Sequence, residues 1–189
     1  MVGIERIKIK SESDWLGNYQ KVNRDCEPMA NKLYIKLFTA LGMPLAGEEI
    51  QETLCEKEDA IGRYDWKEGI DIILHFADGT KATMQEKYLT YHISTMTFET
   101  EKTSGKPGAW YYCTAQYYFI AYAKNYTTGD TSFQDWMLIN LAMLHSIDMK
   151  TVLPWKNNKN KNNGRRASFK YLEFNDVPKD CIVARKRVI

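Results

Sequence analysis

The feature that most constrains the fold is the stretch 69–89, GIDIILHFADGTKATMQEKYL, which contains two apolar runs separated by a tight turn. Residues 77–79, Ala-Asp-Gly, are typical of a β-hairpin loop. Asp71 lies near the start of the first run, and Gln85 and Lys87 lie near the end of the second. Because the strands of a hairpin are antiparallel, these positions meet at its open end. The stretch therefore predicts a hairpin whose open end carries an acid, an amide and a lysine.

The pairing register decides whether these polar side chains share a face, and two registers are open. A two-residue loop at 78–79 places Asp71 opposite Glu86, with Gln85 and Lys87 on the other face of the hairpin. This arrangement separates the acid from the amide and the lysine.

A three-residue loop gives the second register, and it requires a left-handed residue at its third position, where Gly79 stands. Asp71 then opposes Gln85, and Lys87 follows on the same face. The other face becomes mostly apolar, with Ile70, Ile72, Leu74, Ala82, Met84 and Glu86. The grouping of polar residues on one face favours this register.

Such a group suits metal-dependent hydrolysis of phosphodiesters. Mg²⁺ prefers oxygen ligands, and Asp71 offers a carboxylate while Gln85 offers an amide carbonyl. A bound cation acidifies water and neutralises charge on phosphate. Lys87 can hold that water or stabilise the charge of the transition state.

The pattern of Asp71, thirteen intervening residues and then 85–87, Gln-Glu-Lys, resembles the PD-(D/E)XK nuclease superfamily. The succession of GID, QEK and GAWYYCTAQYYFIAYA is similar to the Holliday-junction-resolvase-like proteins of phages and prophages. The resemblance implies a restriction-endonuclease-like α/β (α+β) fold, in which helices flank a central mixed β-sheet. It also implies a Mg²⁺-dependent endodeoxyribonuclease, with Mn²⁺ as a substitute, that acts on branched or otherwise structured DNA.

The resemblance also implies roles for individual residues. Asp71 and Gln85 would be the metal ligands, Lys87 the catalytic lysine, and Glu27 a further acid on the first helix. The chain departs from the family pattern in having Ile70 where Pro is usual and Gln85 where an acid is usual. A neutral ligand weakens metal affinity, so the alternative function is a catalytically weak nuclease-fold module that binds nucleic acid.

Other acids have ordinary explanations beside functional ones. Asp65 is a rival metal acid but suits a turn, and Glu86 belongs to the apolar face of the hairpin. Glu99 and Glu101 suit solvated positions at a strand end. Glu27 equally suits the first turn of a helix, where its charge complements the helix dipole.

The rest of the chain predicts mixed α/β structure in a single domain over 1–189. The first helix is expected to start at 25–28, Asp-Cys-Glu-Pro, and to stop at Gly42. Ser132 is the candidate cap of a later helix. Helices are expected over 28–42, 109–126 and 132–147, with a further helical candidate at 47–61; strands are expected over 92–101, 167–174 and 180–186, and a turn over 103–108.

A basic run over 156–166 has five positive charges and no acid, although the net charge of the chain is only +2. It is a flexible loop or a phosphate-binding segment, with Arg165 and Arg166 as the best-ordered candidates and Lys106 as a second site. DNA is the expected partner, and the sequence leaves open whether the chain acts as a monomer or a homodimer. The aromatic residues over 110–122 suit a core, although exposed members could stack on unpaired bases.

The remaining features bear on location and metal content. The four cysteines are widely spaced and indicate reduced thiols in the cytoplasm, that of the host cell if the protein is phage-encoded. The scattered histidines match no zinc motif. The first fifteen residues lack an apolar signal core, and no stretch is long enough to span a membrane.

Overall fold

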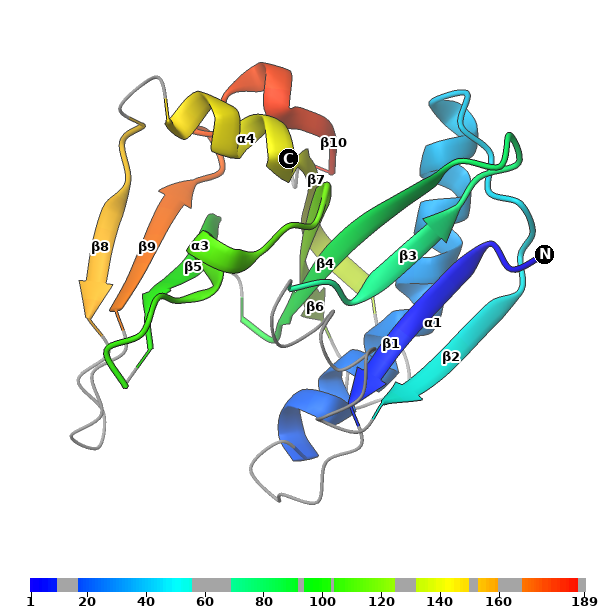
Figure 1. Cartoon of the computed structure of the whole chain (residues 1–189), viewed down its shortest axis with the longest axis horizontal. Helices are drawn as coiled ribbons and strands as arrows, with labels where there is room; N and C mark the ends of the chain where they lie inside the picture. Colours follow the sequence, from blue (N-terminus) through cyan, green and yellow to red (C-terminus); the bar gives the residue numbers. More distant parts are fainter. Residues whose placement is uncertain are drawn as a thin grey trace.

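The computed structural model describes residues 1–9, 17–55, 69–91, 94–102, 104–124, 132–149, 153–159 and 168–186 (Figure 1). Within these ranges the chain forms a mixed α/β structure with two sheets. The elements in chain order are β1 (Ile4–Ile9), α1 (Gly17–Ala40), β2 (Ile50–Cys55), β3 (Ile72–His75), β4 (Lys81–Leu89), β5 (Thr95–Glu101), α3 (Ala109–Tyr112), β6 (Tyr117–Lys124), β7 (Ser132–Asn140), α4 (Leu141–Asp148), β8 (Lys156–Lys159), β9 (Ser168–Glu173), η3 (Lys179–Cys181) and β10 (Ile182–Lys186).

The larger sheet has seven strands in the order β10-β7-β6-β4-β3-β1-β2, and the smaller sheet has three in the order β5-β9-β8. The larger sheet is mixed, because β1 pairs with β2 and β4 pairs with β6 in parallel while its other pairs are antiparallel. The prediction of a central mixed sheet is therefore confirmed.

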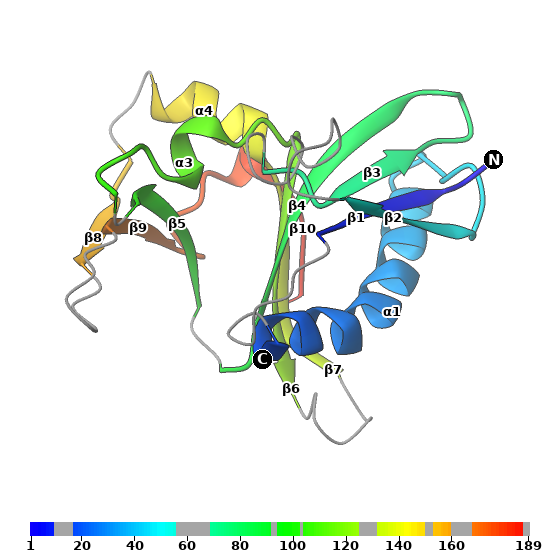
Figure 2. The same ribbon diagram turned by 60° about the horizontal axis from the view of Figure 1, so that its bottom comes forward.

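The two faces of the larger sheet are covered differently (Figure 2). Helix α1 packs on one face, where Tyr34 and Phe38 join the buried strand residues Met84 and Phe119. The smaller sheet packs on the other face together with α3 and α4, and Phe98 is part of that second core. The expected helical layers are thus present on the α1 face, whereas strands form much of the other layer.

The hairpin adopts the three-residue loop. His75 pairs with Lys81, and the Phe76 amide donates to the Thr80 carbonyl at 2.9 Å. Gly79 has a φ of +86°, the left-handed conformation that this loop requires. The predicted apolar face is confirmed, since all of its members are buried: Ile70, Ile72, Leu74, Ala82, Met84 and Glu86.

Helix α1 corrects the predicted start of the first helix. It begins at Gly17 and contains Pro28 in its interior, where a missing amide normally costs about 3 kcal/mol. Residues at four-residue spacing on one side, including Val22, Cys26 and Ala30, are buried against the sheet. That burial offsets the cost of the proline. The predicted stop is confirmed, because the helix ends just before Gly42, whose φ is +75°.

The two helices predicted over 109–126 and 132–147 are mostly wrong. Among the described residues of these ranges, only α3 and α4 are helical, and most of the others belong to β6 and β7. Both strands are central, and residues 118–123 of β6 and 135–139 of β7 are buried without a break, so these stretches lack the alternation that identifies a strand at a surface. Asn140, not Ser132, caps α4 by accepting a 2.9 Å hydrogen bond from the Met143 amide.

Other segments give mixed outcomes. Strand β1 lies in a region where sequence patterns indicated no element, and β2 replaces the helical candidate at 47–61 as far as that segment is described. The strand predictions at 92–101, 167–174 and 180–186 are confirmed by β5, β9 and β10. The expected loop at 156–166 begins instead with β8, and 160–167 lie outside the described residues. In the described part of the chain, no helix has the length and apolarity to cross a membrane.

Candidate functional site

Asp71 lies directly before β3, where the backbone of the neighbouring strand holds it in place. Its amide donates to the Met84 carbonyl at 3.0 Å, and its Oδ2 accepts a 2.7 Å hydrogen bond from the Glu86 amide. Its own carbonyl accepts from the amide of Ile7 at 2.9 Å. Asp71 therefore bonds the backbone of both sequence neighbours of Gln85, one through its amide and the other through its carboxylate.

Gln85 lies on the face of β4 that looks toward the smaller sheet, and it contacts a residue that the sequence did not indicate. The thiol of Cys113 lies 3.3 Å from Gln85 Oε1 and 3.3 Å from the Gly69 carbonyl oxygen. Burial raises the pKa of Cys113 to about 12, and the negative charge of Asp71 adds to this rise. The thiol is therefore neutral at physiological pH, and its single proton lies within reach of two acceptors, the Gly69 carbonyl and Gln85 Oε1.

Gly69 makes this close packing possible. Its φ is +61°, and a Cβ there would lie 2.9 Å from the sulfur of Cys113. A larger residue would therefore push Cys113 away from Gln85 and strain the backbone just before Asp71. The backbone entering the hairpin and the segment after α3 are fitted to each other at this point.

Lys87 follows Gln85 on the same face of β4, and its ammonium group donates to the Thr97 carbonyl at 3.3 Å. Burial lowers the pKa of Lys87, and the nearby carboxylate of Glu99 partly opposes this effect. Burial likewise raises the pKa of Glu99, against the effects of Lys102 and Lys87. Glu99 is partly buried in β5, so the expectation of a fully solvated charge is wrong for it, whereas Glu101 is exposed as expected.

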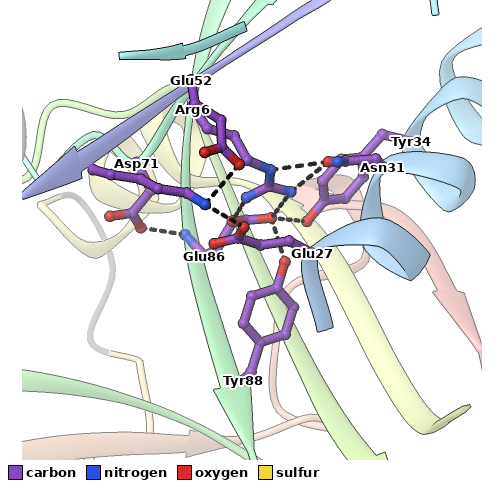
Figure 3. A network of polar contacts seen from close by, with 9 residues as sticks. Arg6, Glu27, Asn31, Tyr34, Glu52, Asp71, Glu86 and Tyr88 are labelled. Atoms are coloured by element: carbon purple, nitrogen blue, oxygen red, sulfur yellow. Dashed lines mark hydrogen bonds and ion pairs between the residues drawn. The ribbon is translucent and has the colours of Figure 1, made fainter. Parts of the chain in front are cut away.

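The side chain of Glu86 points to the opposite face, into a buried polar network (Figure 3). It forms an ion pair with Arg6 and accepts hydrogen bonds from the hydroxyls of Tyr34 and Tyr88. Arg6 also donates through Nε to Asn31 Oδ1 at 3.1 Å. A buried ion pair needs this degree of hydrogen bonding to offset the loss of water around two charges.

The network ties three elements together behind the hairpin. Arg6 comes from β1, Tyr34 from α1, and Tyr88 from β4 itself. Burial raises the pKa of both tyrosines, and the carboxylate of Glu86 raises it further, so both hydroxyls stay protonated as donors. Sequence patterns placed Glu86 correctly on the apolar face but gave no signal for Arg6, because no element was assigned to its segment.

Glu27 lies at the edge of this network rather than beside Asp71. Its carboxylate pairs with the ammonium group of Lys8 at 3.0 Å, and Lys8 also bonds Glu52 at 2.7 Å (Figure 3). The structure thus gives Glu27 a cationic partner on the α1 side of the sheet.

The basic candidates are spread over the fold. Lys106 is exposed in the turn between β5 and α3. Lys156, at the start of the basic run, lies in β8 and pairs with Glu173. Arg165, Arg166 and the rival acid Asp65 lie outside the described residues.

Few metal-binding groups lie at the open end of the β3–β4 hairpin, which is called the hairpin mouth below. Among the described residues, no three His, Cys, Asp or Glu side chains are grouped so that they could hold a metal ion. Asp71 and Gln85 supply one carboxylate and one amide carbonyl. This pair fits a hard cation such as Mg²⁺, which keeps several of its waters and needs only one or two protein carboxylates or carbonyls. It does not fit a structural zinc site, which requires four protein ligands.

Comparison with known proteins gives no relative: no family model, no curated protein and no solved structure matches this chain.

Proposed function

We propose that this chain is a Mg²⁺-dependent nuclease that hydrolyses DNA phosphodiesters at the mouth of the β3–β4 hairpin. The observation that carries the proposal is the position of Asp71, whose carboxylate is held by the Glu86 amide beside Gln85. Lys87 lies on the same face of β4 as Gln85. This is the combination of an acid, an oxygen ligand and a lysine that metal-assisted phosphoryl transfer uses.

Asp71 and Gln85 would hold the cation in this proposal. When bound, the cation would neutralise charge on the phosphate and acidify a water molecule. Lys87 would donate hydrogen bonds to the phosphate oxygens or to the attacking water. Its lowered pKa, caused by burial, brings it closer to proton transfer near neutral pH.

The resemblance to the PD-(D/E)XK superfamily supports the same proposal and extends it. By that resemblance, the substrate is branched or otherwise structured DNA. The protein is encoded by a phage or prophage and acts in the cytoplasm of the host. The central mixed sheet, in which β4 pairs antiparallel with β3 and parallel with β6, supports this proposal, because the resemblance implies a sheet of that kind.

A second candidate is a nucleic-acid-binding module that keeps the fold without tight metal binding. The contact between Cys113 and Gln85 favours it, because the Oε1 that would bind the metal already accepts a hydrogen bond from a thiol. In that case the hairpin mouth is a packing contact rather than a metal site.

Thermal unfolding with and without Mn²⁺ or Mg²⁺ separates the two candidates. A metal site requires that either cation raises the Tm of the wild-type protein and that Asp71→Asn abolishes the rise. The nuclease proposal further requires that Lys87→Ala keeps the metal-dependent rise in Tm but loses cleavage of a labelled DNA. If neither cation stabilises the wild-type protein and no DNA is cut, the binding module replaces the nuclease.

A further inference from the structure

The segment between β5 and β6 leaves the candidate site and returns to it. It departs from β5 near Thr97, whose carbonyl accepts a hydrogen bond from Lys87, and it returns at Cys113, whose thiol contacts Gln85. The two ends of the segment therefore lie at the hairpin mouth, and Tyr111 and Tyr112 directly precede the Cys113 contact.

Backbone contacts hold this segment tightly. The Lys102 amide donates to the Lys106 carbonyl at 2.8 Å, and the Gly108 amide donates to the Thr100 carbonyl at 3.0 Å. A Cβ on Gly108 would lie 2.4 Å from the carbonyl oxygen of Glu99, so only glycine permits this approach. Helix α3 consequently lies beside β5, as both ribbon views show (Figures 1 and 2).

The aromatic residues of α3 divide between the core and the surface. Trp110 is buried, and its ring lies 5.0 Å from that of Phe98, which anchors the helix. Tyr111 is 67% exposed, and the ring of Tyr112 has the Lys102 ammonium group 4.6 Å from its centre. Anchoring by Trp110 fixes the exposed tyrosine in place, so little conformational entropy is lost when a ligand binds it.

The segment carries charges of both signs, with the acids Glu99 and Glu101 at its β5 end. Residues 102–112 contain two lysines and no acid, and Lys106 is exposed in the turn. An isolated exposed tyrosine needs no explanation. An exposed tyrosine on a segment that also carries Lys102 and the exposed Lys106, and that is attached at both ends to a candidate phosphodiester site, combines a surface for base stacking with groups that bind phosphate.

We propose that Tyr111 stacks on an unpaired base and that Lys106 contacts a nearby phosphate, so that the substrate bound at this site is single-stranded nucleic acid or a single-stranded part of a larger structure. This inference rests on the proposed nuclease function and names the substrate class. Duplex DNA cannot use the tyrosine in this way, because its bases already stack on one another.

The test measures binding without cleavage. Fluorescence anisotropy in EDTA compares a labelled single-stranded oligonucleotide with a blunt duplex of the same sequence. Tyr111→Ala is expected to weaken single-strand binding about 5-fold to 100-fold, the range that a lost base–aromatic stack produces. Tyr111→Trp is expected to keep the affinity. Duplex binding is expected to change less than twofold.

Tyr91 supplies the matched control, because it is 60% exposed but lies outside this segment. Tyr91→Ala is expected to leave both affinities unchanged. Lys106→Ala is expected to flatten the slope of log affinity against log salt by about 0.7 on the single strand, the value of one phosphate contact.

Two outcomes overturn the inference. In the first, Tyr111→Ala binds single strands as tightly as Tyr91→Ala does. In the second, Tyr111→Ala loses as much affinity for the duplex as for the single strand. Either can occur while Lys87-dependent cleavage is intact, and then only the substrate class is wrong. Conversely, Tyr111-dependent binding without cleavage in Mg²⁺ or Mn²⁺ supports the stacking surface and refutes the nuclease.

Discussion

The backbone amide of Glu86 donates a 2.7 Å hydrogen bond to Asp71 Oδ2, while the side chain of the same residue is buried against Arg6. Glu86 thus connects the hydrophobic core behind the hairpin to the carboxylate at its mouth. A shift of β4 that breaks the ion pair also moves the amide that orients Asp71. The position of the candidate metal ligand therefore depends on a buried charge pair on the other face of the sheet.

The first prediction concerns that ion pair. Glu86→Gln removes the negative charge and leaves the Arg6 guanidinium buried without a counter-ion, so we expect a loss of about 3–5 kcal/mol in the free energy of unfolding. Adding Arg6→Met should recover a large part of the loss, because no charge is then left unpaired. Urea denaturation of the two single variants and the double variant measures the coupling. Additive losses would show that the two side chains do not depend on each other.

The second prediction concerns the free-energy cost of burying the charged side chain of Lys87. Its burial lowers its pKa below the ordinary 10.5, so the native state holds its proton less tightly than the unfolded state does. Lys87→Met should therefore stabilise the protein at pH 7, by about 0.5–2 kcal/mol, while it abolishes cleavage. The gain should shrink as the pH rises from the native pKa toward 10.5, because the wild-type lysine is then neutral when folded. A variant that is less stable than wild type at pH 7 would contradict this account.

The third prediction concerns the hairpin loop. Gly79 has a φ of +86°, and a Cβ there would touch nothing, so Gly79→Ala tests backbone strain alone. We expect a loss of about 1–2 kcal/mol, and a smaller loss for Gly79→Asn, because Asn adopts the left-handed conformation more readily. Chemical denaturation measures both. Ala77→Ser, an exposed substitution in the same loop, should have little effect. Equal stability of Gly79→Ala and wild type would mean that the loop has another conformation in solution.

The fourth prediction concerns Gln85, the proposed metal ligand that is a neutral amide where an acid is usual. Gln85→Glu places a second negative charge beside Asp71, so Mn²⁺ binding should tighten on the order of tenfold. Calorimetry on the wild type, on Gln85→Glu and on Gln51→Glu makes the comparison, since Gln51 is exposed on the edge strand β2. The cleavage rate need not increase, because Lys87 lies beside a neutral amide in the wild type. Unchanged affinity in Gln85→Glu would show that this side chain does not reach the metal.

The fifth prediction concerns acid sensitivity under the smaller sheet. Burial, and then the charge of Lys170, lower the pKa of His145 below 6.5, with Asp148 partly opposing them. The ring of His145 lies 4.2 Å from that of Trp110. The unfolded state therefore binds a proton first, and stability falls as the pH drops from 6.5 through the native pKa.

His145→Phe should keep the aromatic contact and reduce the loss of stability in that pH window. Lys170→Met removes the neighbouring cation and should therefore raise the pKa of His145. The stability of this variant should then fall less steeply as the pH drops. Thermal unfolding between pH 7.5 and about 5 follows both variants, above the range where most carboxylates titrate. The same pH profile in His145→Phe and wild type would assign the acid sensitivity to other groups.

Local sequence was sufficient for the β3–β4 hairpin, including its register. Gly79 can adopt the left-handed conformation without strain. Apolar residues alternate along β4, so only one pairing register turns all of them toward the core. Both signals act within a few residues, so they can be read without knowing the rest of the fold. The pairing of β3 with β4 from Ile72–Met84 to His75–Lys81 followed from these signals alone.

Tertiary structure decided what local sequence could not. Strands β6 and β7 are covered on both faces, which removes the periodicity that separates a strand from a buried helix. The partner of Glu86 is 80 residues away at Arg6, and the partner of Gln85 is 28 residues away at Cys113. Such contacts depend on which strands become neighbours in the sheet. The sequence by itself therefore determined the hairpin and its polar trio, and packing of distant segments determined which groups surround that trio, because burial is a property of the whole fold.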